Sequence, residues 1–210
     1  MSKGAASLGV IVLAAGFGSR FREETGAFKL LAPLQGKPLV RHVTEAALDA
    51  ALGPVVVVTG HGARQVRAAL AGLDVSFIDN ADYASGMASS LKAGLRALQA
   101  DCAGALICLG DMPGVGARVL RALAQAFVAA PGTQVVVPTF NGERGNPVLL
   151  ARGIFSRLEK LSGDQGARKV IGALTHGVVE LAVDDAHVLL DVDTPQALNA
   201  LQARQTKKPD

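Results

Sequence analysis

The chain has 210 residues, half of them hydrophobic and only 4% aromatic, and its formal net charge is +3. This length supports one sizeable core, and the small charge without a long basic run argues against nucleic acid as a main partner. The longest apolar run, residues 8–16, is too short to span a bilayer, so no association with a membrane is expected.

Apolar runs alternate with helical patterns along the first two thirds of the chain. Strands are predicted at 8–13, 54–59, 75–78, 104–109 and 134–138. Helices are predicted at 38–52, 63–73, 86–99 and 116–130, the first of them opening with a proline in its first turn. This alternation favours right-handed βαβ units on a mostly parallel sheet.

The pattern loosens after residue 138. Residues 146–150 and 177–183 resemble further strands, with helical pieces between them, and residues 195–204 resemble a final helix. The predicted fold is therefore a single three-layer αβα Rossmann-like domain with a mostly parallel mixed sheet. It spans 8–203, and residues 1–7 and 204–210 are predicted to be disordered.

The two cysteines, Cys102 and Cys108, have no CxxC spacing, and Cys108 lies in an apolar run. A buried, reduced thiol is expected there, which is typical of a reducing compartment. Because the first apolar run continues into GFGSRF without a plausible cleavage site, a secretory leader is not favoured and a cytoplasmic location is expected.

The segment LAAGFGSR follows the first predicted strand. In an open α/β sheet, ligands bind beyond the carboxyl ends of the strands, and a glycine turn there exposes N–H groups toward an anion. Arg20 can reach the same anion with two nitrogens, and Lys29 adds a second cation. The spacing fits neither the dinucleotide fingerprint nor the P-loop, and an ordinary strand-to-helix turn is the alternative.

With Arg20 and Lys29, this loop resembles the signature loop of the nucleotidyltransferases, although about four extra residues lie between the two cations. The resemblance implies a triphosphate held by the loop. The residues implied to bind the nucleotide here are Leu13, Ala14, Ala15, Gly16, Gly18, Ser19, Arg20 and Lys29.

Two aspartate motifs are candidates for a metal site. Asp111 ends an apolar strand in LGDMP, and a carboxylate at that position is well placed to hold Mg²⁺, unless it only caps the next helix. Asp191 and Asp193 are two residues apart and can share one face, although one of them can instead cap the helix that begins at Pro195. LGDMP matches the metal-binding motif of the same family, which implies Asp111, and the later DVDTP segment resembles the place of a second metal ligand in that family, which implies Asp193, with Asp191 ranked lower.

Three further segments narrow the resemblance to the molybdenum cofactor cytidylyltransferases of the MobA-like NTP transferase family. DYASGMASSL resembles their nucleobase-binding stretch, which adds Gly86, Ser89 and Ser90 to the nucleotide-binding set, together with Thr59 at a strand end. ERGNPVLL and GDQGAR resemble their acceptor motifs, with Asn146 in place of the usual histidine. The implied acceptor-binding residues are Arg144, Gly145, Asn146, Pro147, Asp164, Gly166 and Arg168.

The resemblance covers residues 8–201 and implies transfer of CMP from CTP to the phosphate of the molybdopterin–molybdenum cofactor, with release of pyrophosphate. Arg20, Lys29 and Asp111 are the implied catalytic residues, and Mg²⁺ is the implied cofactor. A molybdoenzyme or its chaperone would be a further partner. The residues alone leave open a guanylyltransferase for the same acceptor, a sugar-phosphate nucleotidyltransferase and a non-catalytic nucleotide or cofactor carrier.

Overall fold

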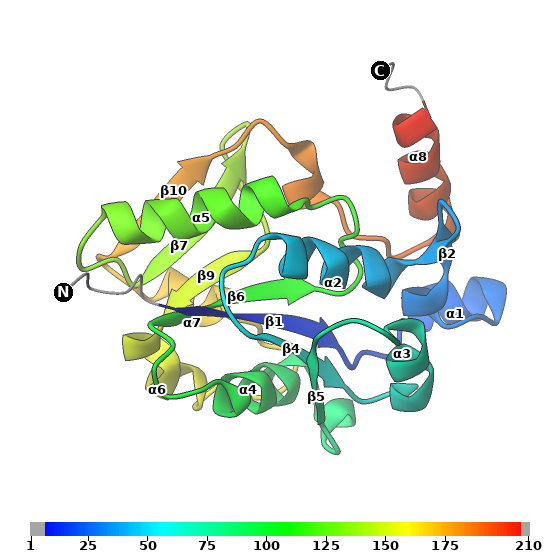
Figure 1. The fold of residues 1–210 in the computed structure, drawn as a ribbon, viewed down its shortest axis with the longest axis horizontal. Helices are drawn as coiled ribbons and strands as arrows, with labels where there is room; N and C mark the ends of the chain where they lie inside the picture. Colours follow the sequence, from blue (N-terminus) through cyan, green and yellow to red (C-terminus); the bar gives the residue numbers. More distant parts are fainter. Residues whose placement is uncertain (1–6, 207–210) are drawn as a thin grey trace.

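The computed structural model describes residues 7–206 (Figure 1). The main strands are β1 (Leu8–Ala14), β4 (Val55–Thr59), β5 (Ser76–Asp79), β6 (Gly104–Leu109), β7 (Val135–Phe140), β9 (Val148–Ala151) and β10 (Val178–Ala182). Three two-residue strands accompany them: β2 (Pro33–Leu34), β3 (Lys37–Pro38) and β8 (Glu143–Arg144). The α-helices are α1 (Ser19–Thr25), α2 (Leu39–Asp49), α3 (Ala63–Ala69), α4 (Met87–Ala97), α5 (Ala117–Ala129), α6 (Phe155–Leu158), α7 (Arg168–Gly172) and α8 (Pro195–Thr206). The 3₁₀ turns are η1 (Lys29–Leu31), η2 (Tyr83–Ser85), η3 (Arg152–Ile154) and η4 (Ala186–Leu189).

The main sheet has the strand order β10-β7-β9-β6-β1-β4-β5, and β8 pairs with β7. β6, β1, β4 and β5 are parallel to one another, and β10 is parallel to β7. β9 lies antiparallel between β6 and β7. The prediction of a mostly parallel mixed sheet is therefore confirmed.

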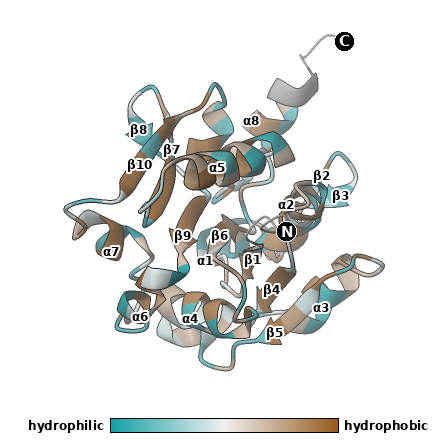
Figure 2. Ribbon diagram, turned by 60° about the vertical axis from the view of Figure 1, so that its left-hand side comes forward, coloured by the Kyte–Doolittle hydropathy of each residue, from teal (hydrophilic) through white to brown (hydrophobic). Residues whose placement is uncertain are grey.

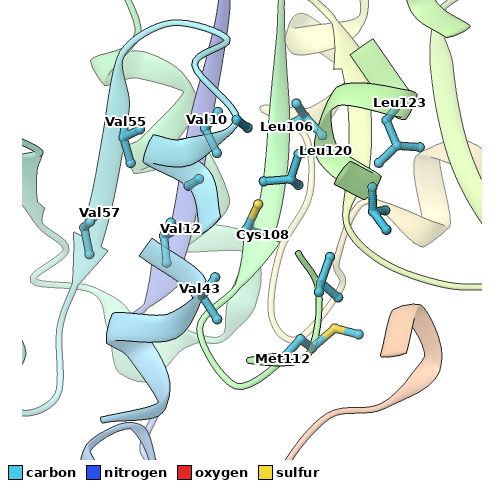
Figure 3. Packing of buried hydrophobic residues seen from close by; sticks show 14 of the residues in the cluster. Val10, Val12, Val43, Val55, Val57, Leu106, Cys108, Met112, Leu120 and Leu123 are labelled. Carbon is cyan, nitrogen blue, oxygen red and sulfur yellow. The ribbon is translucent and has the colours of Figure 1, made fainter. Parts of the chain in front are cut away.

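Helices cover both faces of this sheet. On one face α2, α3 and α5 pack against Val10, Val12, Val57 and Leu106 (Figure 3). On the other face α4, α6 and α7 pack against Ile11, Val56, Val58 and Ile107. Adjacent residues of β1 and of β4 thus belong to opposite cores, which explains why these strands are continuously apolar. In Figure 2 the strands are correspondingly brown, whereas the helices carry teal on their outer surface.

A smaller third cluster packs the N-terminal helix α1 against the C-terminal helix α8. Phe21 of α1 is buried with Leu34, Leu39, Leu198 and Leu201. The roughly four extra residues predicted between Arg20 and Lys29, at or near REET, lie in and next to α1. Figure 1 shows α1, β2 and α8 together at one end of the molecule.

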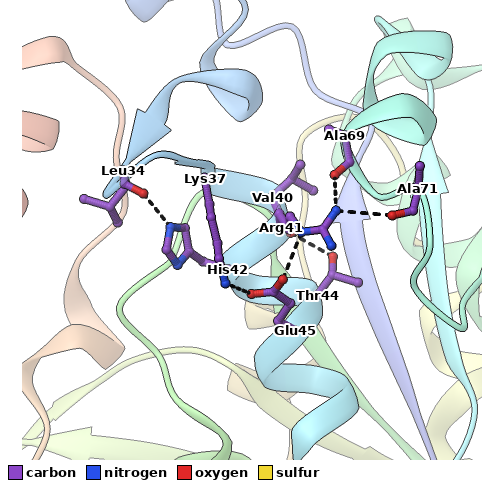
Figure 4. Close-up of polar contacts among 9 residues, drawn as sticks. All are labelled: Leu34, Lys37, Val40, Arg41, His42, Thr44, Glu45, Ala69 and Ala71. Atoms are coloured by element: carbon purple, nitrogen blue, oxygen red, sulfur yellow. Dashed lines mark hydrogen bonds and ion pairs between the residues drawn. The ribbon is translucent and has the colours of Figure 1, made fainter.

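Polar contacts hold α2 in place beside this cluster (Figure 4). Lys37 Nζ and Arg41 Nε pair with the two carboxylate oxygens of Glu45, at 2.8 and 2.9 Å. The hydrogen bond from Lys37 and, less strongly, that from Arg41 lower the pKa of Glu45, although partial burial opposes them. His42 Nε2 lies 2.8 Å from the carbonyl oxygen of Leu34. This network holds α2 in position, and it is separate from the candidate active site.

Several element boundaries differ from the prediction. The helix predicted from residue 38 begins at Leu39 with Pro38 as its N-cap, since Pro38 is extended and pairs in β3. α3 ends at Ala69, four residues before its predicted end. α8 continues to Thr206, past the domain end predicted at 203. Of the ends predicted to be disordered, residues 1–6 and 207–210 lie outside the described residues, and Ser7 accepts a backbone hydrogen bond from Ala103.

Both cysteines are buried and free, as expected for a reduced thiol in the core. Burial raises the pKa of the Cys108 thiol to about 12. Among the helices of residues 7–206, none has the length and apolar character needed to cross a bilayer.

Candidate active site

The parallel strands bring the glycine loop and Asp111 to the same edge of the sheet. β1 and β6 are adjacent and parallel, so the segments that follow them leave the sheet side by side. Gly110 N donates a hydrogen bond to the carbonyl oxygen of Leu13 at 3.0 Å, and this contact fixes the LGDMP turn next to the start of the glycine loop. The loop comprises residues 15–18, between β1 and α1.

The two glycines of the loop differ in their surroundings. Gly18 has φ 58° and caps α1, and a Cβ atom there would lie 2.8 Å from Lys29 Cβ. Gly16 has an ordinary φ, and a Cβ atom there would meet nothing within 4 Å. Gly18 is therefore required by the protein itself, whereas Gly16 leaves open space that a ligand can occupy.

Lys29 lies between the two aspartates that were predicted to bind metal. Its Nζ is 2.7 Å from Asp111 Oδ2 and 2.7 Å from Asp193 Oδ1, and the residue is 7% exposed. Burial alone would lower the pKa of Lys29, but the charges and hydrogen bonds of Asp111 and Asp193 outweigh it and raise the pKa above its ordinary value. Arg20 Nη1 lies 3.3 Å from Asp193 Oδ2 and is largely exposed.

A backbone hydrogen bond connects the DVDTP segment, residues 191–195, to Asp111. Val192 N donates to the carbonyl oxygen of Asp111 at 2.9 Å. The N-cap of α8 is Thr194, whose Oγ1 accepts a hydrogen bond from Ala197 N at 3.2 Å. Neither Asp191 nor Asp193 is used as that cap, and Asp193 pairs with Lys29 and Arg20 instead.

Asp191 is exposed but lies near the same negative charges. Partial burial, together with Asp193 and Asp111, raises the pKa of the Asp191 carboxyl. Within residues 7–206, no three carboxylates, histidines or cysteines converge in a geometry that could hold a metal ion. Asp111 and Asp193 are thus a two-carboxylate site at most, which suits Mg²⁺ because this ion is usually bound by one or two carboxylates together with substrate phosphates.

The hydroxyl groups of the predicted nucleobase-binding residues make hydrogen bonds within the protein. Asn80 Nδ2 donates to Ser89 Oγ at 2.8 Å and to Ser90 Oγ at 3.0 Å. Thr59 Oγ1 donates to the carboxylate of Asp79 and to the carbonyl oxygen of Ile78. These three hydroxyls are thus engaged within the protein, where they support the local fold.

A cluster of aromatic side chains borders the glycine loop. This cluster was not predicted from the sequence. The Phe17 ring lies 4.9 Å from the His61 ring and 5.1 Å from the Tyr83 ring, and Phe28 contacts His61 edge-on at 5.4 Å. Phe17 is 41% exposed. The available signal was composition: aromatic residues are scarce in this chain, yet they recur beside the glycines of GFG, GHG and the DYASG turn.

A cleft of about 860 Å³ lies beside the aspartates. Its wall includes six of the seven predicted acceptor-binding residues, namely Arg144, Gly145, Asn146, Asp164, Gly166 and Arg168. Asp191 and Leu13 also line it, so the cleft adjoins both the metal-site candidates and the start of the glycine loop. The seventh predicted residue, Pro147, is absent from the cleft lining and lines a separate small cavity together with Cys108 and Met112.

The charged residues that line this cleft differ in whether their side chains have a hydrogen-bond or ion-pair partner within the protein. Arg144 Nε donates to Glu180 Oε1 at 2.8 Å, which holds its guanidinium toward β10. Within residues 7–206, the side chains of Asp164 and Arg168 make no hydrogen bond or ion pair, and both are exposed. The floor is apolar and includes Leu91, Ile107, Leu109, Met112, Val137 and Val148.

The nucleobase stretch and the GDQGAR loop touch each other directly. Gly86 has φ 106°, and a Cβ atom there would lie 2.5 Å from the carbonyl oxygen of Gly163 and 2.7 Å from Asp164 N. Ala88 N also donates to the carbonyl oxygen of Gly163 at 3.0 Å. Gly86 therefore acts through close backbone packing that positions the loop carrying Asp164 and Arg168.

Residues 10–179 match the MobA-like NTP transferase domain. A curated relative, the bifunctional protein GlmU of Cupriavidus necator, is 32% identical over 82% of this chain. Another GlmU, from Kineococcus radiotolerans, is 43% identical over 62% of this chain. The matched parts cover 37% and 26% of these proteins, so the chain spans only about a quarter to two fifths of their length.

A solved structure of similar fold is Rv0371c from Mycobacterium tuberculosis H37Rv. It is 30% identical with a TM-score of 0.83, and the match covers 95% of this chain and 99% of that one. A structure of Rv0371c in complex with manganese gives a TM-score of 0.77 at 29% identity, covering 94% of this chain and 98% of that one. With the family match over most of its length, this chain belongs to the MobA-like NTP transferase domain family.

Proposed function

We propose that this protein is a molybdenum cofactor cytidylyltransferase, which transfers CMP from CTP to the terminal phosphate of the molybdopterin–molybdenum cofactor. The observation that carries the proposal is the juxtaposition of two sites. The Asp111–Asp193 pair lies beside the glycine loop, and the cleft that holds the acceptor motifs adjoins it through Asp191.

The residues of the glycine loop are suited to the nucleotide. The open space at Gly16 lets a triphosphate approach the backbone closely, and Arg20 supplies an exposed guanidinium nearby. In the proposed reaction an oxygen of the acceptor phosphate attacks the α-phosphorus of CTP. The bond between that phosphorus and the oxygen bridging to the β-phosphate breaks, and pyrophosphate leaves with the bonding electrons.

Asp111 and Asp193 are the proposed ligands of Mg²⁺, since their oxygens converge on one point that already holds a cation, the Lys29 ammonium. When bound, Mg²⁺ would supply positive charge that neutralises the phosphates during transfer. A relative of this fold was crystallised with manganese, which supports a divalent ion of this type. Catalysis by the chain's own residues would be positioning and charge neutralisation, because phosphoryl transfer requires little covalent help.

The cleft supports a fused-ring acceptor over a sugar. A sugar phosphate presents hydroxyls around its ring, and hydroxyls that lose water without gaining hydrogen bonds weaken binding. The aliphatic side chains that line this cleft suit the faces of a flat ring system, and the polar side chains that line it suit the polar edges of such a ring system. Asp164 and Arg168, whose side chains have no partner among the described residues, are the proposed contacts for those edges and for the phosphate.

The deciding experiment measures pyrophosphate release with CTP, GTP, ATP and UTP, each with and without the molybdopterin cofactor. Release with CTP and the cofactor together, well above the other combinations, is the expected result. Release with GTP in place of CTP would indicate the guanylyltransferase, and release in a further assay with a sugar phosphate as acceptor would indicate the sugar-phosphate nucleotidyltransferase. Nucleotide binding without release under any condition would indicate a carrier. The proposed reaction would take place in the cytoplasm, and a molybdoenzyme or its chaperone would receive the product.

A further inference from the structure

The ammonium of Lys29 occupies the place that a metal ion would need. Its Nζ is 2.7 Å from one oxygen of each aspartate, so it lies where the two carboxylates converge. Arg20 contacts the other oxygen of Asp193. Two carboxylates are thus already balanced by two cationic side chains within the protein.

A divalent metal ion and this ammonium cannot occupy the same position. Mg²⁺ binds carboxylate oxygens at about 2.0–2.1 Å, and a cation placed between these oxygens would lie almost on top of Nζ. Two adjacent cations repel strongly where water is scarce, and Lys29 is 7% exposed. Metal binding therefore requires the Lys29 ammonium to move away.

The ammonium can move only if another anion receives it. A buried charge that loses its partner is strongly destabilising, so in the protein alone the carboxylates hold Lys29 in place. Gly18 of the glycine loop lies directly against the Lys29 side chain, where a Cβ atom would come within 2.8 Å. A triphosphate bound on this loop would present its oxygens next to the lysine and offer the required anion.

We propose that Lys29, assisted by Arg20, keeps divalent metal out of the Asp111–Asp193 pair until a nucleoside triphosphate binds. The triphosphate draws both cations away from the carboxylates, and the metal takes their place. Metal and nucleotide therefore bind with strong positive coupling, and the protein alone has low metal affinity. This inference rests on the proposed nucleotide site, but it does not depend on which acceptor is used.

The test measures Mn²⁺ binding to the protein without nucleotide, by the electron paramagnetic resonance signal of free Mn²⁺. Lys29→Met should bind Mn²⁺ about tenfold more tightly than the wild type, or more, because the competing cation is gone. Lys37→Met is the matched control, since Lys37 pairs with Glu45 on α2 and should leave Mn²⁺ affinity unchanged. Equal Mn²⁺ affinity of Lys29→Met and the wild type would overturn the inference.

A second variant keeps the test decisive if Lys29→Met does not fold. Arg20 is largely exposed, so Arg20→Met should fold, and it should raise Mn²⁺ affinity in the same direction by a smaller factor. An unchanged affinity in Arg20→Met would count against the inference when Lys29→Met cannot be measured. Adding CTP should increase Mn²⁺ affinity more in the wild type than in either variant, since coupling between two ligands is reciprocal.

The result can be separated from the proposed function. A protein that binds Mn²⁺ as expected but transfers no CMP to the molybdopterin cofactor would refute the substrate and leave the role of Lys29 intact. A protein that transfers CMP but binds Mn²⁺ equally well with and without Lys29 would refute the role of Lys29 alone.

Discussion

The two halves of the candidate site differ in whether their charged side chains are paired with one another or exposed without a partner. Around the glycine loop, Lys29 pairs with both Asp111 and Asp193, and Arg20 adds a fourth charge beside Asp193. In the cleft, Asp164 and Arg168 remain exposed to solvent, and no described residue pairs with either side chain. The first half lies at the ends of core strands, where an unpaired charge would be costly, whereas the second lies on a loop and a five-residue helix that water can reach.

This difference predicts different consequences for mutation. A substitution in the paired half alters a balance of charges, so it should change metal and nucleotide binding together. A substitution in the cleft removes a contact proposed for the acceptor alone, so it should change the acceptor KM and spare CTP binding. Four substitutions test this contrast.

The largest effect is expected for Asp111→Asn. The substitution removes a charge at the end of β6 without changing core volume, so the fold should persist while turnover falls on the order of 10²-fold or more. Pyrophosphate release measures the turnover, and circular dichroism checks the fold. Asp101→Asn, at an exposed turn before the same strand, is the control and should retain full activity. Pyrophosphate release near the wild-type rate in Asp111→Asn would reject Asp111 as a metal ligand.

Arg168→Lys tests the cleft. Lysine keeps the charge but lacks the planar fork that binds a phosphate or a ring edge through two nitrogens. A charge-assisted hydrogen bond contributes about 1.5–3 kcal/mol, so the acceptor KM should rise about ten- to a hundredfold while CTP binding holds. Arg157→Lys on α6, outside the cleft lining, provides the control. Weaker CTP binding with an unchanged acceptor KM would mean that the two halves have been assigned the wrong way round.

The contrast also explains which features could be predicted from the sequence. The strand and helix order was readable because β1, β4 and β6 are continuous apolar runs and the helices between them are amphipathic. The edge that carries the glycine loop and Asp111 followed from the rule for parallel strands. α1 was not foreseen, because its seven residues are mostly polar and its position depends on Phe21 packing against the distant α8.

Side-chain partners were less predictable than positions. Nothing local in the sequence indicates that Lys29 pairs with residues 82 and 164 positions away. Similarly, Ser89 and Ser90 look available for a ligand until Asn80 is placed against them by β5 and α4. These contacts depend on tertiary packing, and spacing rules describe only neighbours within one helix or strand.

Gly86→Ala tests whether the predicted nucleobase-binding stretch and the GDQGAR loop are mechanically joined. A Cβ atom at this position would press on the backbone of Gly163 and Asp164, and φ 106° is unfavourable for alanine. The protein should lose about 1–3 kcal/mol of unfolding free energy in urea denaturation, and displacement of the GDQGAR loop should raise the acceptor KM. Gly153→Ala, where a Cβ atom meets nothing within 4 Å, is the matched control. Equal stability of the two variants would show that the contact between Gly86 and the loop yields easily.

The smallest effect is expected for Arg20→Ala. The Arg20 side chain is 76% exposed and contacts Asp193 only at 3.3 Å, so water and salt weaken its electrostatic contribution. CTP affinity should fall about two- to fivefold, and the difference from the wild type should shrink as ionic strength rises, because exposed charges are screened. Isothermal titration with CTP at low and high salt measures both, with Arg118→Ala on the exposed side of α5 as the control. The same residue is expected to oppose Mn²⁺ when no nucleotide is present, so its removal should strengthen metal binding and weaken CTP binding. A loss of CTP affinity that does not change with salt would instead place Arg20 in direct, desolvated contact with the triphosphate, and the contrast between a paired half and an open half would then hold only for the protein without nucleotide.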